Sequence, residues 1–581
     1  MTRSLRRRQS RKRQADNSSV DIKDKLAQKR KAKATRRKLM GLIGFSLFFA
    51  ILVGVPLSFS ISPKIGGSVG LLIPLFVVCY NYPRTALWAF LIYMPFSGTM
   101  TYWIGGGNAL FQLSKDGFYI PGLLGLIYYC RKKKQAIIVS KPLLITLVLL
   151  ATCALLTLFF VNGAKQFLPT CDSISYDDRY LRDANGEWIL SADGIVIRTP
   201  CKNSIPFAQG ILGLKVLAGY IPLIFCAYYL INDKKQLLFL GRLLVVIAII
   251  CCGLALIQFW MFKTGRCQGT DHLAGELLFK PTIKARCLVG GSALYSPSQG
   301  QIRMPGTFVS PWHWGWFLVA NAAICFSVAF SDSAFFWRNC GLFGMAMVFI
   351  NAVICGQRLA LALVPAVMII MLFLTGKIAD FKRFIPIAIG LSLVLLIGFS
   401  FLNPDFVQER IDSFVGRWNA SPPYSFIQEQ FDFAMRTQKG FLGQGLGSGT
   451  NSTRIFGKVS LIETYHPKLL FEMGFPGLIA FMIFVSHLCF LTFKIYRGLK
   501  DECLKSFASS FWVFLLIIAY FPYWYPLDTD PVCVYYWLFA GVLLKLPVID
   551  KEEQIKLKAQ KAAEDALKKR VKTKRRNPSA I

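Results

Sequence analysis

Long apolar runs recur from one end of this chain to the other. Runs such as 143–161, 243–262, 359–375 and 385–402 are each close to the length that a helix needs to cross the hydrocarbon layer of a membrane. Strands and open loops would leave backbone groups without hydrogen bonds in lipid, so these runs are expected to be helices. With 54% apolar and only 17% charged residues, the 581-residue chain belongs to the membrane class.

The pattern predicts an all-α polytopic membrane protein with about 14 transmembrane helices and both termini in the cytoplasm. The segments that this count places inside are basic, for example 131–134, 233–235 and 494–505, as the positive-inside rule requires. The expected spans are 40–61, 67–82, 86–104, 117–130, 142–162, 207–231, 243–262, 311–330, 339–356, 359–376, 384–402, 476–493, 507–525 and 532–547.

The formal net charge of +36 comes mostly from two basic tails, 1–38 and 548–581, which flank a transmembrane domain at 39–547. Beside a first span, such charge is typical of a segment held in the cytoplasm, where it also attracts anionic membrane lipids. We therefore expect membrane lipids, and no nucleic acid, as partners of the tails.

Three segments that the topology places outside are long: 163–206, 263–310 and 403–475. Loops of this size beside a membrane usually cover or build a site. In the third loop, the spacing of apolar residues over 424–436 predicts an amphipathic helix, which either rests on the outer leaflet or caps the bundle.

Two of these loops contain cysteines, and each contains an even number. Cys171 and Cys201 fall in the first loop, and Cys267 and Cys287 fall in the second. On an oxidising side of the membrane, this arrangement predicts one disulfide within each loop, and free thiols are the alternative.

Ionisable residues are scarce in the expected spans, and none of them is Asp or Glu. Proton-coupled and cation-coupled transporters generally need a buried carboxylate, so this composition weighs against a pump or symporter. Lys215 lies in the outer half of the sixth span. It either faces a polar cavity or extends its ammonium group to the interface.

Two external residues have side chains suited to group transfer. Arg358 lies in the short turn between the ninth and tenth spans, where its guanidinium can anchor a lipid headgroup or hold a phosphate. His466 is the sole histidine of the third loop and has the pKa range of a general base, although a structural role is the common one for a lone histidine. The glycine-rich stretch 440–447 lacks the Lys-Ser/Thr of a phosphate loop.

At these positions the chain resembles the O-antigen ligase and polymerase superfamily of bacterial envelope glycosyltransferases. The resemblance covers roughly 210–493 and depends on the order of four short motifs between spans. The motifs are Arg303-x-x-Gly306-x-Phe308, Gln357-Arg358, the glycine-rich stretch 442–447, and His466 followed by Glu472-x-Gly474-x-x-Gly477.

The resemblance implies that a glycan is transferred from an undecaprenyl-diphosphate donor to a hydroxyl of an acceptor glycan or glycolipid. The reaction would take place at the periplasmic face of the bacterial inner membrane, in lipopolysaccharide or exopolysaccharide synthesis, without metal or cofactor. Partners in polysaccharide assembly or export are also expected.

The resemblance also assigns roles to residues. Arg358 and a second loop arginine would hold the leaving diphosphate, and His466 would deprotonate the acceptor. Arg417 is favoured as the second arginine, with Arg410 and Arg436 as alternatives by position. Substrate contacts are expected from Arg303, Lys215, Arg436 and Glu472.

Two other classes of function fit parts of the pattern. A transporter or flippase for an anionic solute or glycolipid would use Lys215 and Arg358 as an anion path. A scaffold for an export complex would need no chemistry at these residues.

Overall fold

The computed structural model describes residues 37–60, 63–107, 114–171, 204–278, 281–296, 301–376, 422–438, 440–521 and 526–576, with isolated positions between these ranges. The described residues are mainly helical, with one two-stranded sheet. The chain divides into two compact units. Unit 1 comprises Met1–Phe90 and Leu113–Lys134, and unit 2 comprises Leu91–Gln112 and Gln135–Ile581.

Ten helical segments in the described part are long and apolar enough to cross a membrane. They are Arg37–Ser60, Lys141–Gln166 (α6 Lys141–Leu156, a π-helical turn and α7 Ala164–Gln166), Pro206–Leu230 (α8 Pro206–Ala218 and α9 Leu223–Leu230), α10 Lys234–Lys263, α11 Pro311–Ser331, α12 Phe335–Ile354, α13 Arg358–Thr375, α17 Tyr465–Gly498, α18 Glu502–Tyr520 and α19 Val532–Arg576. The chain is therefore a multi-pass α-helical protein.

Four expected spans are not among these ten. Three are helical: α2 (Pro63–Asn81), whose apolar part is Val69–Asn81, α3 (Pro83–Tyr93, continued by 3-10, α and π turns to Ile104) and α5 (Asp116–Lys132). In unit 1, α2 packs against α5. The expected span at 384–402 lies outside the described residues.

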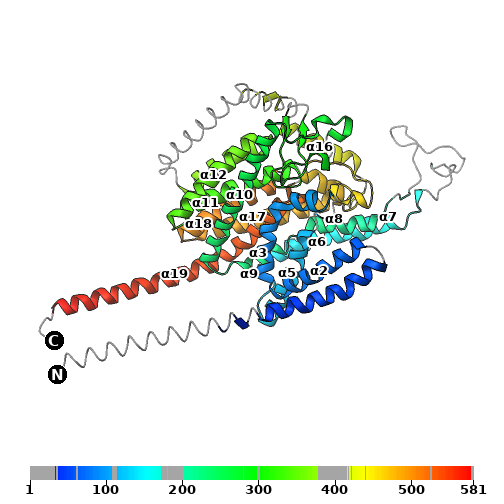
Figure 1. Ribbon diagram of the computed structural model, residues 1–581. Helices are drawn as coiled ribbons and strands as arrows, with labels where there is room; N and C mark the ends of the chain where they lie inside the picture. Colours follow the sequence, from blue (N-terminus) through cyan, green and yellow to red (C-terminus); the bar gives the residue numbers. More distant parts are fainter. Residues whose placement is uncertain are drawn as a thin grey trace. The chain divides into compact units, whose positions relative to one another are not determined.

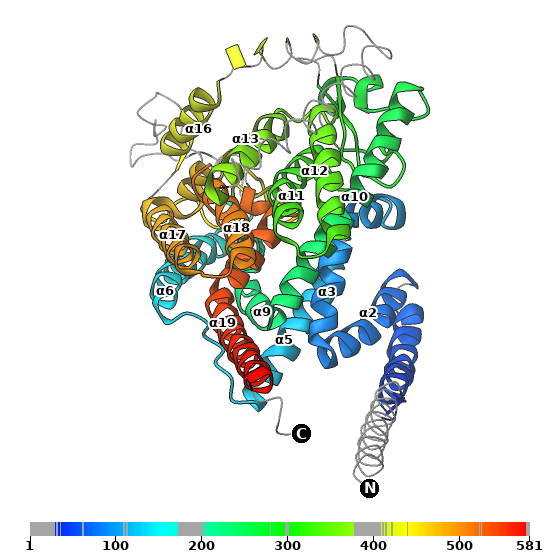
Figure 2. The same ribbon diagram turned by 90° about the vertical axis from the view of Figure 1, so that its left-hand side faces the viewer.

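The core of unit 2 is built around α11. Every residue of this helix from Trp314 to Ala329 is buried, and α10, α12, α13 and α18 pack around it. Figure 2 shows α11 between α12 and α18. A helix covered on all sides can be apolar all round, which is why α11 lacks a polar face. The last part of α19 is exposed and extends beyond the other helices of the unit (Figure 1).

Unit 2 has two distinguishable ends. Gly315 in the first turn of α11 lies against Gln357 at the start of α13, so these two helices begin at the same end. The Tyr496 hydroxyl near the end of α17 donates a hydrogen bond to the Leu374 carbonyl near the end of α13, at 3.0 Å. The starts of α11, α13 and α17 therefore share one end, which we call the loop end.

The opposite end is held by ion pairs between helix termini. Lys234 pairs with Asp501 at 2.7 Å, which joins the start of α10 to the start of α18. Arg242 pairs with Asp332 at 2.7 Å, next to the turn between α11 and α12. The segments 233–235 and 494–505, which the sequence assigns to the cytoplasm, thus meet at one end of the unit.

The second long loop is compact. Cys267 and Cys287 form a disulfide with Cα atoms 5.6 Å apart, and β1 (Leu294–Ser296) pairs antiparallel with β2 (Gln301–Arg303). Arg286 fastens this loop to the segment after α3, because its Nη1 donates to the Tyr102 carbonyl at 2.8 Å. A second disulfide joins the described ends of the first long loop, Cys171 and Cys201, with Cα atoms 5.0 Å apart. Both are the pairs expected from the sequence.

Two expected spans differ in detail from the helices observed. The span at 207–231 is interrupted between α8 and α9, where Pro222 has no N–H to continue the helical hydrogen bonds. The span expected to begin at 476 belongs to a helix that begins at Tyr465, and Gly474, with φ 65° and ψ −170°, breaks it near the loop end. The helical segment before Gly474 contains His466 and Glu472.

Candidate functional site

At the loop end, Arg303 lies against the turn that carries Arg358. The Met304 N–H, directly after β2, donates to the Cys355 carbonyl at 3.1 Å, which lays β2 against the turn between α12 and α13. Gly356 permits this contact, because a Cβ there would lie 3.4 Å from the Arg303 Cα. Arg303 therefore neighbours the turn that carries Arg358. Both side chains are half-buried.

His466 is buried in the first turn of α17. Its Nε2 lies 3.1 Å from the Ala519 carbonyl oxygen at the end of α18, and its ring packs 6.1 Å from that of Phe481. Because a carbonyl oxygen only accepts hydrogen bonds, Nε2 must carry the proton. The neutral ring then has its lone pair on Nδ1. His466 is thus held as a tautomer whose Nδ1 can accept a proton.

Arg358 and His466 both lie toward the loop end. Each belongs to the first turn of its helix, and the far ends of the two helices are joined by the hydrogen bond from Tyr496 to Leu374. α18 runs in the opposite direction and places Ala519, the partner of His466, at the same end. Any chemistry shared by these two residues requires this placement.

The glycine-rich stretch, here called the glycine loop (440–450), packs against α17. Glu472 holds it, because Oε1 accepts hydrogen bonds from the Gly449 N–H at 2.9 Å and from the Thr450 hydroxyl at 2.8 Å. The Gln444 N–H donates to the Phe471 carbonyl at 2.8 Å. These contacts of Glu472 hold the glycine loop, and its expected role as a substrate contact stays a prediction.

Two polar residues on other helices hold the glycine loop from its far side. Asn162 lies in the π-helical turn Thr157–Gly163; its Oδ1 accepts from the Leu446 N–H at 2.8 Å and its Nδ2 donates to the Leu446 carbonyl at 3.0 Å. Gln209 on α8 donates to the carbonyls of Gly447 and Lys458, at 3.2 Å each. Sequence reasoning missed both residues. The sequence feature that could have indicated them is a polar amide side chain within an otherwise apolar run.

The glycines of this region allow two backbones to touch. Gly443 has φ 72°, and a Cβ there would lie 2.6 Å from the backbone nitrogen of Gly474. A Cβ at Gly474 would in turn collide with the Phe441 carbonyl oxygen. Close packing of the two backbone segments explains these glycines.

A buried lysine lies between two carboxylates beside His466. Lys468 forms an ion pair with Asp528, in the connection between α18 and α19, and its Nζ is 4.0 Å from Glu472 Oε2. All three side chains are largely buried, so the charges stabilise one another in a region with little water. Sequence reasoning missed this cluster. The sequence feature that could have indicated this cluster is Lys468, which lies one helical turn before Glu472.

The other expected site residues are dispersed. The Lys215 Nζ lies 5.2 Å from the centre of the Tyr220 ring on the same helical segment. Arg436 is exposed, and its Nε donates to the Asp432 carbonyl of its own helix, α16 (Pro423–Thr437). Arg410 and Arg417 lie outside the described residues.

The amphipathic helix expected in the third loop is α16. Ala434 and Phe431 pack with Leu470 and Phe471 of α17, so one face of α16 covers the start of that helix. Other apolar residues of α16 are exposed, among them Phe433 and Met435. The structure therefore places α16 as a cap on α17.

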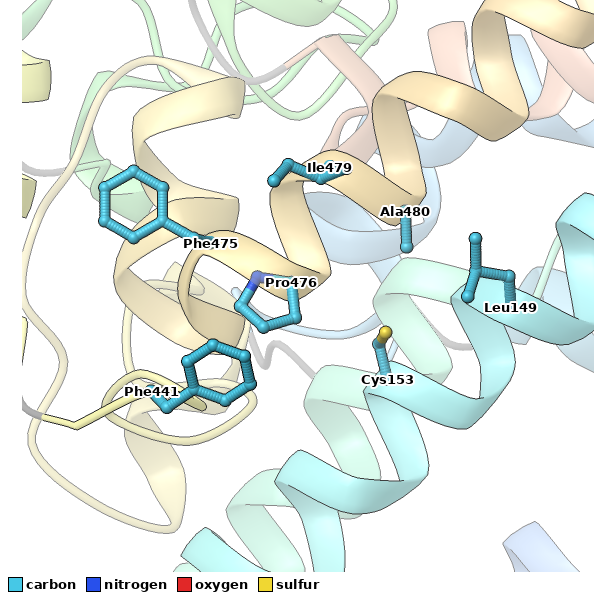
Figure 3. Close-up of a pocket in the computed structure, with 7 residues that line it drawn as sticks. All are labelled: Leu149, Cys153, Phe441, Phe475, Pro476, Ile479 and Ala480. Atoms are coloured by element: carbon cyan, nitrogen blue, oxygen red, sulfur yellow. The ribbon is translucent and has the colours of Figure 1, made fainter.

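An apolar hollow of about 290 Å³ lies between α6 and α17 at the Gly474 break. Figure 3 shows the residues that line it: Leu149, Cys153, Phe441, Phe475, Pro476, Ile479 and Ala480. Several of these side chains are exposed, so the hollow opens at the surface of the unit.

Comparisons with known proteins were made with family models, curated proteins and solved structures. None of them matches the chain. Among the described residues, no three His, Cys, Asp or Glu side chains gather as metal ligands would.

Proposed function

We propose that this protein transfers a glycan from a polyprenyl-diphosphate donor to an acceptor hydroxyl, as an O-antigen ligase or polymerase does. The reaction would occur at the loop end, on the periplasmic side of a bacterial inner membrane. The observation that carries the proposal is the contact of β2 with the turn at Gly356, which places Arg303 against the turn that carries Arg358. Paired guanidinium groups suit a diphosphate, because their forked donors match phosphate oxygens.

His466 would act as the base. As the acceptor oxygen attacks the anomeric carbon of the donor sugar, Nδ1 takes the hydroxyl proton. The bond between that carbon and the diphosphate oxygen breaks, and the diphosphate leaves with the electron pair. The charge that develops on the leaving group would be stabilised by Arg303 and Arg358.

Two further features support a lipid-linked donor. The hollow between α6 and α17 is lined almost entirely by apolar side chains and lies among helices able to span a membrane, so it suits part of a hydrocarbon chain. Glu472 and Lys468 brace the helical segment that carries His466, which would keep the base in a fixed position.

The direct test is glycan transfer by purified protein in lipid nanodiscs. The donor would be the lipid-linked glycan that accumulates in cells lacking the gene. His466→Ala and Arg358→Ala are each expected to reduce transfer at least 100-fold, in line with the loss of a general base or of a charge-stabilising group. Membrane levels of both variants should match the wild type.

Matched controls come from the same chain. His487 on α17 hydrogen-bonds Thr146 at 3.3 Å, and Arg266 is an exposed arginine of the second long loop. His487→Ala and Arg266→Ala are expected to retain transfer. Full activity of both His466→Ala and Arg358→Ala would defeat the site assignment. Lipid-linked glycan or anion movement across proteoliposomes without an acceptor would favour a transporter.

A further inference from the structure

The residue before Arg358 is a glutamine whose side chain is buried without a partner. Gln357 is 2% exposed, and neither its Oε1 nor its Nε2 has a hydrogen-bond partner among the described residues. Gln357 also occupies the N-cap position of α13, yet its side chain does not cap that helix. The amide is therefore not used to hold the fold.

An amide buried in this way costs free energy, because it has lost its hydrogen bonds to water and gained none in return. Natural proteins rarely keep such a group without a reason. Two more buried donors lack partners on the adjoining stretch of α11, the Nε1 atoms of Trp314 and Trp316, and Gly315 between them lies against Gln357. Unpartnered buried polar atoms thus occur on both segments that meet where Gly315 contacts Gln357.

We propose that the Gln357 amide binds the first sugar of the donor, next to the diphosphate held at Arg358. This inference rests on the proposed function. A diphosphate offers only acceptors and would satisfy Nε2 alone. A sugar with hydroxyl or N-acetyl groups offers donors and acceptors together and satisfies both amide atoms. In the donor, the first sugar is attached directly to the diphosphate. Gln357 directly precedes Arg358 in the sequence, so its amide is close to where that sugar would lie when Arg358 holds the diphosphate.

The sugar would approach from the side where the neighbouring residues are partly exposed. Arg303, Arg358, Trp312 and His313 are all half-buried, whereas Gln357 is buried. Aromatic and guanidinium groups at such a rim suit the faces and oxygens of a sugar. Gln357 would form the floor of the sugar site.

The test compares two ligands that differ only in the sugar. One probe is polyprenyl diphosphate carrying a single N-acetylhexosamine, and the other is the same lipid without sugar. Wild-type protein in detergent should bind the first about tenfold more tightly, the usual effect of a satisfied hydrogen-bonding group. Gln357→Met, similar in size but without the amide, should lose this difference. Arg358→Ala should weaken binding of both lipids.

Thermal melting without ligand provides a second measurement. Gln357→Met should melt at the same temperature as the wild type or higher, because it removes an unpartnered polar group. Gln209→Met is the matched control and should melt lower, because it removes the hydrogen bonds that Gln209 donates to the Gly447 and Lys458 carbonyls. Melting of Gln357→Met as low as that of Gln209→Met would show a structural amide and overturn the inference.

The binding results separate the two proposals. If Gln357→Met binds both lipids as the wild type does, or weakens both equally, the sugar assignment is wrong and glycan transfer by the arginines and His466 can still stand. If the wild type binds neither lipid, the proposed function fails and the sugar site fails with it.

Discussion

Glu472 accepts a hydrogen bond from the backbone N–H of Gly449, at 2.9 Å, across 23 residues of sequence. The same carboxylate oxygen accepts from Thr450, and the other oxygen faces Lys468. One acidic side chain thus joins the glycine loop to the helical segment that bears His466. Loss of this link should affect both the stability and the geometry of the candidate site.

Glu472→Ala is expected to lower the free energy of unfolding by about 3 kcal/mol, because it leaves buried donors and the Lys468 charge poorly compensated. Glu472→Gln should cost less, since its amide oxygen still accepts hydrogen bonds. Thermal melting in detergent measures both changes. Glu429→Gln, an exposed acid on α16, is the control. Equal melting of Glu472→Ala and the control would contradict the packing role.

Gly474→Ala is expected to destabilise the protein by about 2 kcal/mol or more, because a left-handed φ strains any side chain and a Cβ would collide with the Phe441 carbonyl. Gly498→Ala, at the other end of the same helix, meets no atom within 4 Å and should be neutral or stabilising. Melting temperatures of the two variants provide the comparison. If they shift alike, backbone contact at Gly474 does not explain the glycine.

Replacement of Cys267 and Cys287 by serine should destabilise the second long loop by about 3 kcal/mol, the usual contribution of a disulfide that closes a loop of this size. Since that loop contains β2 and Arg303, glycan transfer should fall as well. Cys340→Ser, which removes a free thiol on α12, is the matched control. Proteolysis of the loop and the transfer assay measure the effect. Unchanged susceptibility and activity would show that the loop is held by its other contacts.

The ion pair between Arg242 and Asp332 predicts a pH dependence of stability. Burial by itself raises the pKa of the Asp332 carboxyl. The hydrogen bonds that it accepts from Arg242 and from the Ala334 N–H, together with the positive charge of Arg242, outweigh burial and lower the pKa below its usual value. The ionised carboxylate therefore stabilises the fold above its unfolded pKa of about 3.9, and this contribution is lost as pH falls through the lower folded pKa.

Asp332→Asn should accordingly melt several degrees below the wild type at pH 7, as expected for about 2 kcal/mol from a partly buried pair. The difference should shrink below about pH 4, where the Asp332 carboxylate of the unfolded chain starts to take up a proton while that of the folded chain is still ionised. A melting series from pH 7 to pH 3 tests this. A difference that stays constant over the whole series would exclude the ion pair as its source.

Much of the fold follows from local properties of the sequence. A membrane span is recognised from about 20 consecutive apolar residues, and its helical state follows because lipid offers no hydrogen bonds to the backbone. The two disulfides could also be predicted from local sequence, because each loop contains only two cysteines and they pair with each other. The break at Gly474 was missed, because hydropathy does not report φ.

The sequence by itself determined that this chain is a multi-pass helical protein, which segments are loops, and that Arg358 and His466 are its reactive candidates. Only the tertiary structure decided that Arg303 adjoins the Arg358 turn, that Glu472 serves the glycine loop, and that Lys468 lies between two carboxylates. The reason is physical. Apolarity is a property of neighbouring residues, whereas most of these contacts join residues tens of positions apart, and their formation depends on how whole helices pack.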